Sequence, residues 1–167
     1  MDMPKRVPMR LKEYDYSQNG VYFVTICTDK RKNILSQIAF INEDVGEGLC
    51  ALPQTQLTDL GKIVDSSINH IGKQNNIQID KYVIMPNHVH ILMSLVVETG
   101  GHRGPPLHSI IGQLKSYTTY KCGCKIWQRS FFDHIIRDEN DYLRCWQYIN
   151  NNPIKWELDK YYAGDKE

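Results

Sequence analysis

The sequence predicts an α+β fold in which an antiparallel β-sheet carries helices on one face. Apolar residues recur at helical spacing over 56–73 and 107–118 and at strand spacing over 77–95. Together with flanking strand-like segments, they follow the order strand, helix, strand, strand, helix, strand. This order is the main basis for the predicted fold.

The first half of the chain supplies one strand and one helix. Residues 21–28 are β-branched or aromatic almost throughout, which is typical of a central strand. Residues 56–73 have an apolar stripe at helical spacing after Thr55, a candidate N-cap, and predict a helix that covers one sheet face. Residues 29–56 are either a short hairpin around Gly46 and Gly48 or an insertion loop.

The most informative segment is a predicted hairpin that contains two histidines. Pro86 and Asn87 have turn chemistry, and the following strand alternates His88 and His90 with aliphatic residues. Side chains two apart on a strand point to one face with Cα atoms roughly 6.5 Å apart, which allows two imidazoles to bind one cation. We expect a metal or acid-base site here, on an open sheet face.

The sequence also allows two other interpretations of the histidines. They are the polar face of a half-exposed strand, or they belong to a structural zinc site. Structural zinc usually takes four ligands in local pairs, but Cys122 and Cys124 have only one residue between them. An open site for a metal and a substrate oxygen is therefore favoured over structural zinc.

The second half completes the predicted sheet. Residues 98–106 are rich in glycine and proline and predict a flexible connection, which leads into the helix over 107–118. Residues 127–137 predict the fourth strand. The resulting order is that of the ferredoxin-like plan, βαββαβ, with spatial strand order 4-1-3-2 and the histidine strand at a central position.

An additional helix is predicted at the C-terminal end. It begins after the N-cap Asp138 and ends near Asn152, because Pro153 disfavours helix in the preceding residue. Its predicted buried stripe is Tyr142, Cys145, Trp146 and Ile149. Asp141, Tyr148 and Asn152 share a flank outside this stripe, so Tyr148 is available for chemistry.

Composition and charge narrow the class of protein. Length and a 41% hydrophobic content suit one domain over 1–167, with 1–18 as an extended arm and 157–167 as a tail. Five cysteines at irregular spacing, without a signal-like segment, predict reduced thiols and a cytoplasmic protein. No segment approaches transmembrane length.

Nucleic-acid binding is predicted locally, since the net charge is only +1. Basic and aromatic residues are interleaved between residues 114 and 137, a pattern that suits phosphate contacts and base stacking. Solvated lysines over a buried aromatic cluster are the alternative. The predicted DNA-binding residues are Lys115, Tyr117, Lys121, Arg129 and Arg137.

Three motifs in this order resemble the REP-associated tyrosine transposases, of the histidine-hydrophobe-histidine superfamily of single-tyrosine transposases. They are the hairpin Val-Ile-Met-Pro-Asn-His-Val-His-Ile-Leu, the segment Trp-Gln-Arg-Ser-Phe-Phe-Asp-His-Ile-Ile-Arg and the helix end Tyr-Ile-Asn-Asn-Asn-Pro-Ile-Lys. The resemblance runs from about residue 20 to residue 156. It implies a ferredoxin-like fold and cleavage of single-stranded DNA at hairpin-flanked sites, by a monomer or a homodimer.

The resemblance also implies residue roles. Tyr148 corresponds to the nucleophile that forms a 5′-phosphotyrosine link, and His88 and His90 correspond to ligands of Mg²⁺ or Mn²⁺. Asn152 stands where related insertion-sequence transposases have a metal-binding glutamine, so it is the expected third ligand. Two other functions stay open: a non-catalytic single-stranded DNA or RNA-binding domain of the same fold, and a metal-dependent hydrolase of small phosphoesters.

Overall fold

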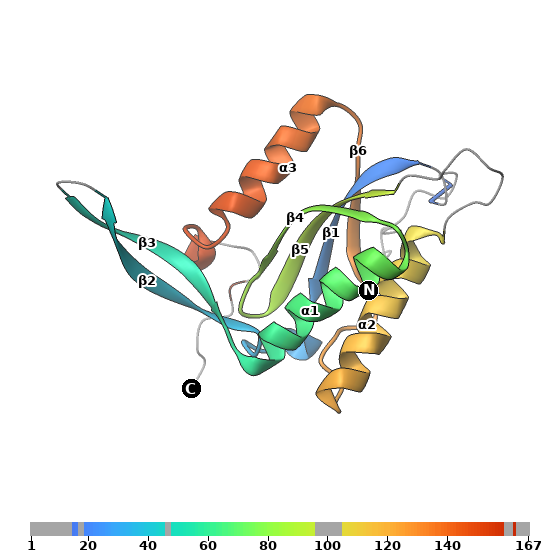
Figure 1. Ribbon diagram of the computed structural model, residues 1–167, viewed down its shortest axis with the longest axis horizontal. Coiled ribbons are helices and arrows are strands. Elements are labelled where there is room, and N and C mark those ends of the chain that lie inside the picture. The colour runs from blue at the N-terminus through green and yellow to red at the C-terminus, as the bar shows by residue number, and fades with distance from the viewer. Residues whose placement is uncertain (1–14, 17–18, 46–47, 96–104, 159–161, 163–167) are drawn as a thin grey trace, which may run out of the picture.

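A four-stranded antiparallel sheet forms the centre of the protein. The computed structural model describes residues 15–16, 19–45, 48–95, 105–158 and 162 (Figure 1). The strands are β1 (Gly20–Cys27), β4 (Gln78–Ile84), β5 (His88–Leu95) and β6 (Phe132–Ile136). Their spatial order is β4-β5-β1-β6. This is the predicted 4-1-3-2 order, so the ferredoxin-like prediction is confirmed, including the central place of the histidine strand.

Two helices, α1 (Asp59–Gln74) and α2 (Leu107–Cys122), pack side by side on one face of the sheet (Figure 1). The residues between the helices and the sheet are aliphatic and almost fully buried: Val24, Ile26, Val64, Ile68, Val89, Ile91, Ile110, Ile111 and Leu114. Burial of each such side chain stabilises the fold by about 1.5–3 kcal/mol. The aliphatic alternation of β1 and β5 thus faces the helices, and the intervening residues face the other side.

The N-terminus of α1 differs from the prediction by one turn. Thr58, not Thr55, is the N-cap, and its hydroxyl accepts a hydrogen bond from the Gly61 amide at 3.1 Å. Thr55 instead lies within strand β3, paired with Ile38. A Cβ on Gly61 would stand 2.0 Å from the Leu35 carbonyl oxygen, so only glycine allows this close approach.

The segment between β1 and α1 is a hairpin, the first of the two predicted alternatives. Strands β2 (Ser36–Val45) and β3 (Gly48–Leu57) pair with each other in a separate two-stranded sheet. In Figure 1 this ribbon projects away from the domain. Before it lies a short 3-10 helix, η1 (Asp29–Arg31).

The fourth strand is shorter than predicted. Strand β6 covers Phe132–Ile136, and of the predicted residues before it, Trp127 forms only an isolated bridge with Thr28. In this irregular segment the ammonium group of Lys115 donates to the carbonyl oxygens of Gln128 and Ser130, at 3.0 and 2.8 Å.

The C-terminal helix α3 (Glu139–Asn151) lies across the sheet face opposite α1 and α2 (Figure 1). Asp138 caps it as predicted, accepting from the Asp141 amide at 2.8 Å. The expectation of an open histidine face is therefore wrong in part: α3 and the following 3-10 helix η2 (Trp156–Leu158) cover it.

The predicted stripe of α3 also needs correction. Ile149 is buried, but Tyr142, Cys145 and Trp146 are only half-buried. Asp141 and Asn152, predicted to lie outside the stripe, are 8% and 2% exposed. The reason is that the sheet beneath α3 presents histidine, threonine and phenylalanine instead of an aliphatic surface, so polar helix residues are the better partners.

Some predicted segments lie outside the described residues. These are most of the arm over 1–18, most of the connection over 98–106 and most of the tail over 157–167. Within the described part of the chain, no helix has both the length and the apolar character needed to cross a bilayer.

Candidate active site

The two histidines of β5 lie side by side on the face that α3 covers. Strand pairing sets His88 opposite Cys27 and His90 opposite Thr25 of β1. Their ring centroids are 4.5 Å apart and the two residues are 0% and 1% exposed. The same-face prediction is confirmed, and the pair is buried rather than displayed on a half-exposed strand.

The turn residue Asn87 fixes the orientation of His88. The amide nitrogen of Asn87 donates to the Arg31 carbonyl at 3.3 Å, which leaves its Oδ1 as an acceptor. This oxygen is 2.8 Å from Nδ1 of His88, so Nδ1 carries the proton. Nε2 of His88 then bears the lone pair that a cation binds, which is the tautomer of a metal-ligating histidine.

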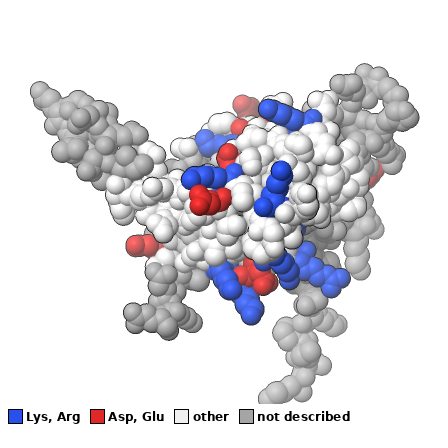
Figure 2. Space-filling view, turned by 60° about the horizontal axis from the view of Figure 1, so that its bottom comes forward, with Lys and Arg blue, Asp and Glu red and all other residues white. Residues whose placement is uncertain are grey.

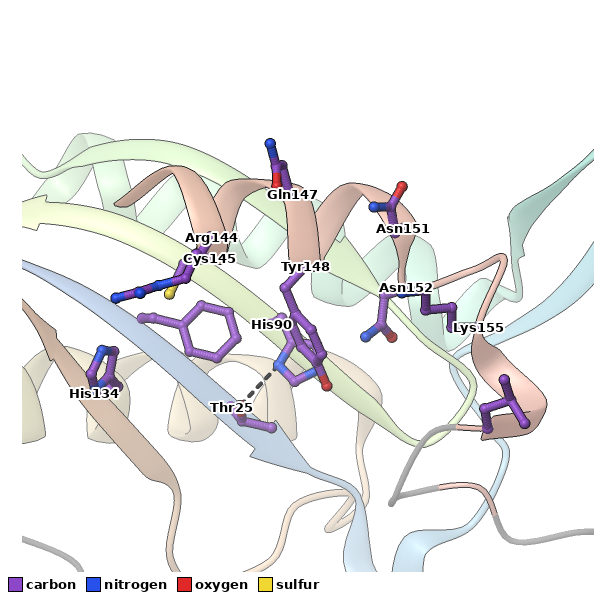
Figure 3. Close-up of a pocket in the computed structure, with 12 residues that line it drawn as sticks. Thr25, His90, His134, Arg144, Cys145, Gln147, Tyr148, Asn151, Asn152 and Lys155 are labelled. Atoms are coloured by element: carbon purple, nitrogen blue, oxygen red, sulfur yellow. Dashed lines mark hydrogen bonds between the residues drawn. The ribbon is translucent and has the colours of Figure 1, made fainter. Parts of the chain in front are cut away.

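A matching interaction orients His90. The hydroxyl of Thr25 is 2.8 Å from Nδ1 of His90, a bond drawn in Figure 3. Phe23, two residues earlier on β1, stacks on the His90 ring with 5.1 Å between centroids. Both histidines therefore use Nδ1 within the protein. Nε2 of His90 is a candidate ligand like Nε2 of His88 when the Thr25 hydroxyl accepts from Nδ1, because Nε2 then bears the lone pair.

Tyr148 of α3 stands over this pair. Its ring meets His90 edge-on at 5.1 Å between centroids and Phe23 at 5.9 Å. Tyr148 is 40% exposed although His90 beneath it is buried, so part of the Tyr148 side chain is accessible to solvent. The helix thus holds a phenol directly beside the histidine site, as Figure 3 shows.

A cavity of about 800 Å³ opens beside Tyr148, between α3 and the strands β1 and β6. Predicted site residues Tyr148, His90 and Asn152 line it, and Figure 3 shows the Asn152 side chain directed from the end of α3 toward the sheet. His88 does not line the cavity. Its ring lies between contacts with His90 and with Trp156, whose centroids are 4.5 and 5.9 Å away.

The predicted DNA-binding residues do not join this cavity. Tyr117 of α2 stacks on His70 of α1, with centroids 4.5 Å apart, in the helical layer. Lys121 and Arg129 are exposed near the end of α2 and in the loop that follows. Arg137 follows β6, and its backbone amide donates to Asp141.

The predicted DNA-binding residue Lys115 has a structural role in the absence of DNA. Its ammonium group is engaged with backbone carbonyl oxygens.

The surface charge supports no single basic patch on the side seen in Figure 2. That view brings the bottom of Figure 1 forward, and lysine and arginine side chains are separated there by uncharged and acidic surface. A net charge of +1 agrees with this dispersed arrangement.

A second polar cluster joins α3 to β6. Asp141 Oδ2 is 2.8 Å from Nε2 of His134, and its Oδ1 accepts from the Arg144 guanidinium at 3.3 Å. Although burial raises the pKa of Asp141, the bonds from His134, the Arg137 amide and Arg144 hold it below its ordinary value. The carboxylate is therefore ionised at neutral pH.

Cys145 lies in the same cluster. Among the described residues, the ligand atoms of His134, Asp141 and Cys145 are within 4.8 Å of one another. Burial, followed by the charge of Asp141, raises the pKa of the Cys145 thiol to about 11. A protonated thiol and a nearby guanidinium both disfavour a cation, so we interpret the cluster as an ion-pair network rather than a metal site.

We expect Asp141→Asn to lower the free energy of unfolding by about 2 kcal/mol at pH 7, because charge-assisted bonds to His134 and Arg144 are lost. The folded-state pKa of Asp141 lies below its unfolded value of 3.8, so this stabilisation is complete above pH 3.8. It is lost as the pH falls through the folded-state pKa. Urea denaturation of both proteins over a pH series measures the difference.

The matched control is Asp59→Asn, since the Asp59 side chain is 97% exposed in its pair with Lys62. Exposed pairs of this kind contribute little, so the control should match the wild-type protein. A difference between Asp141→Asn and wild type that stays constant down to the acid limit would show that the carboxylate charge is unimportant.

Sequence reasoning missed several residues that complete the site. Thr25 and Phe23 alternate with the buried Val24 on β1, and only the register of β1 against β5 reveals that they meet His90. The sequence indicates Asn87 only as a turn residue. Its position directly before His88 is nevertheless a usable signal that its side chain can orient the histidine ring. The cluster of His134 with Asp141 depends on the packing of α3 and carries no local signature.

The chain was compared with known proteins. No protein-family model matches it. An uncharacterized protein of Haemophilus influenzae is 34% identical over 180 residues, which cover 95% of this chain and 93% of that protein. The REP-associated tyrosine transposase of Escherichia coli is 29% identical over 100 residues, covering 59% of this chain and 58% of the transposase.

A solved structure has a similar fold. It is the structure of a REP-associated tyrosine transposase bound to a REP hairpin, and it covers 90% of this chain and 76% of its own. The TM-score is 0.64 and the sequence identity 23%, which supports a shared fold. Together with the ordered hairpin, strand and helix-end motifs, these similarities show that this chain is related to proteins named REP-associated tyrosine transposases.

Proposed function

We propose that the protein cuts and rejoins single-stranded DNA at hairpin-flanked sites through a covalent bond to Tyr148. The observation that carries this proposal is the position of Tyr148, with its ring edge-on to His90 at 5.1 Å and at the rim of the same cavity. A phenol is a weak nucleophile that gains from fixed orientation beside a group that neutralises phosphate charge. The rigid helix α3 provides that orientation.

A divalent cation, Mg²⁺ or Mn²⁺, fits the residues present. Nδ1 of His88 and of His90 is hydrogen-bonded to Asn87 and Thr25, which leaves the two Nε2 atoms as ligands. Asn152, 2% exposed at the end of α3, offers its amide oxygen to the cavity that His90 lines. When bound there, such a cation would neutralise charge on the phosphate and stabilise the leaving oxygen.

The residues of this chain then have distinct tasks. The Tyr148 oxygen forms a bond to phosphorus, the bond from phosphorus to the 3′-oxygen breaks, and the 3′-oxygen leaves as a hydroxyl with a proton. The phenolic proton passes to solvent at the exposed side of the ring. Because one phosphodiester bond replaces another, a 3′-hydroxyl can attack the phosphotyrosine and reverse the step without another energy source.

The test is to incubate the protein with labelled single-stranded DNA from the flanks of its own gene, in Mg²⁺ or Mn²⁺ and in EDTA. The proposal expects a protein-DNA adduct that survives denaturation and forms only with metal. Free cleavage products without an adduct would instead indicate a hydrolase that activates water. Binding without cleavage in any metal would indicate a non-catalytic nucleic-acid-binding domain.

The predicted residues outside the cavity have a separate task in this proposal, namely contact with the hairpin stem away from the cut bond. We expect the joint change Lys121→Gln and Arg129→Gln to weaken binding of hairpin DNA. The slope of log affinity against log salt concentration should become shallower by about 0.9 for each lost contact to a duplex phosphate. Fluorescence anisotropy at several salt concentrations measures this slope.

Cleavage by that double variant at saturating DNA should equal wild type, because neither residue lines the cavity. Lys62→Gln together with Lys73→Gln, on α1, is the matched loss of two charges. Unchanged affinity and slope in the Lys121 and Arg129 variant would remove this surface from the DNA path.

A further inference from the structure

We propose that His134 and Arg144 form a second phosphate-binding subsite, which holds the DNA backbone next to the bond attacked by Tyr148. The inference rests on the proposed function, since the ligand is the same DNA strand. Both residues line the cavity that Tyr148 lines. In Figure 3 they approach each other from β6 and α3, at the end of the cavity opposite Lys155.

One buried carboxylate organises both side chains. Asp141 uses Oδ2 for His134 and Oδ1 for Arg144, so the imidazole and the guanidinium are held on two oxygens of the same group. The Asp141 side chain is only 12% exposed and does not line the cavity. The cavity therefore meets the imidazole and the guanidinium and not the negative charge that positions them. Arg144 keeps further N–H donors for a phosphate, and His134 offers a second donor, at Nδ1, when its ring is protonated.

The side chains of His134 and Arg144 remain accessible to a ligand. The His134 and Arg144 side chains are 51% and 72% exposed. A guanidinium has five N–H donors in a planar fork, and the bond to Asp141 uses one of its nitrogens. The remaining donors suit two oxygens of a phosphate, which is the geometry that distinguishes arginine from lysine.

The spacing along α3 matches a DNA strand. Arg144 and Tyr148 are four residues apart on one helix face, or roughly 6 Å along the helix axis. That is about the span of one nucleotide in an extended single strand. The aromatic ring of Phe23, which contacts both His90 and Tyr148, lines the same cavity and offers an apolar surface to the sugar or base.

A phosphate-neutralisation scan tests the subsite in the Tyr148→Phe background, where cleavage cannot consume the probe. The probe is a hairpin oligonucleotide from the flanks of this gene, with single methylphosphonate linkages placed in turn along its single-stranded tail. Arg144→Gln should weaken binding of unmodified DNA about tenfold at low salt. One methylphosphonate should cause a similar loss with Arg144 intact.

The decisive result is non-additivity: at that one linkage, Arg144→Gln should cause no further loss, and His134→Gln should couple to the same linkage. Lys62→Gln, on α1, is the control. Its effect on affinity should add to that of the methylphosphonate at every linkage. Additive losses for Arg144→Gln at every linkage would overturn the subsite, whereas a wild-type adduct would still support the proposed function. If coupling is found but the wild-type protein forms no adduct, the subsite is supported as part of a DNA-binding protein and the proposed function is refuted.

Discussion

Replacing Tyr148 with phenylalanine is expected to abolish the covalent protein-DNA adduct while the fold and DNA binding are retained. The ring contacts with His90 and Phe23 persist in phenylalanine, so the free energy of unfolding should change by less than about 1 kcal/mol. Loss of the proposed nucleophilic oxygen should lower the cleavage rate on the order of 10⁴-fold or more. Denaturing gels and mass spectrometry of the trapped peptide measure both points.

The other tyrosines near basic residues provide the contrast. Tyr117 stacks on His70 in the helical layer, and Tyr120 is 80% exposed on α2, so neither shares the cavity with His90. Tyr117→Phe and Tyr120→Phe should therefore keep wild-type adduct formation. An adduct that persists in Tyr148→Phe, or that maps to Tyr117 or Tyr120, would overturn the assignment of the nucleophile.

Replacing His90 with alanine should remove metal-dependent cleavage and also destabilise the protein. The sequence alone suggests that such a change leaves the fold intact, because it places the histidine on an open face. The structure shows a 1% exposed ring with a bond to Thr25 and contacts to Phe23 and Tyr148. Its loss leaves a buried hydroxyl and a void, at a cost of about 2–4 kcal/mol.

Separate measurements distinguish the two effects. Mn²⁺ titration followed by electron paramagnetic resonance reports metal binding in the absence of DNA, and urea denaturation reports stability. His88→Ala should behave in the same way, since His88 is equally buried and bonded to Asn87. His70→Ala in the helical layer is the control for a histidine outside the site. Folded His88→Ala and His90→Ala proteins with full cleavage and Mn²⁺ binding would refute the metal assignment.

The sequence by itself determined which residues are the candidates for the chemistry. The alternation of His88 and His90 with aliphatic residues reflects a strand with one face in the core, and that pattern is local. The cap at Asp138 and the stop before Pro153 are also local, so the extent of α3 was predictable within a residue or two. Strand order followed from element order, because few connections of this kind are sterically favoured.

Only the tertiary structure decided how these residues are buried and paired. Thr25 meets His90 across 65 residues of sequence, and Asp141 meets His134 only because α3 folds back over the sheet. Such contacts depend on strand register and on the packing of one layer against another, which residue periodicity does not encode. For the same reason the sequence left the histidine face open, whereas the polar side chains of α3 find their hydrogen-bond partners by covering it.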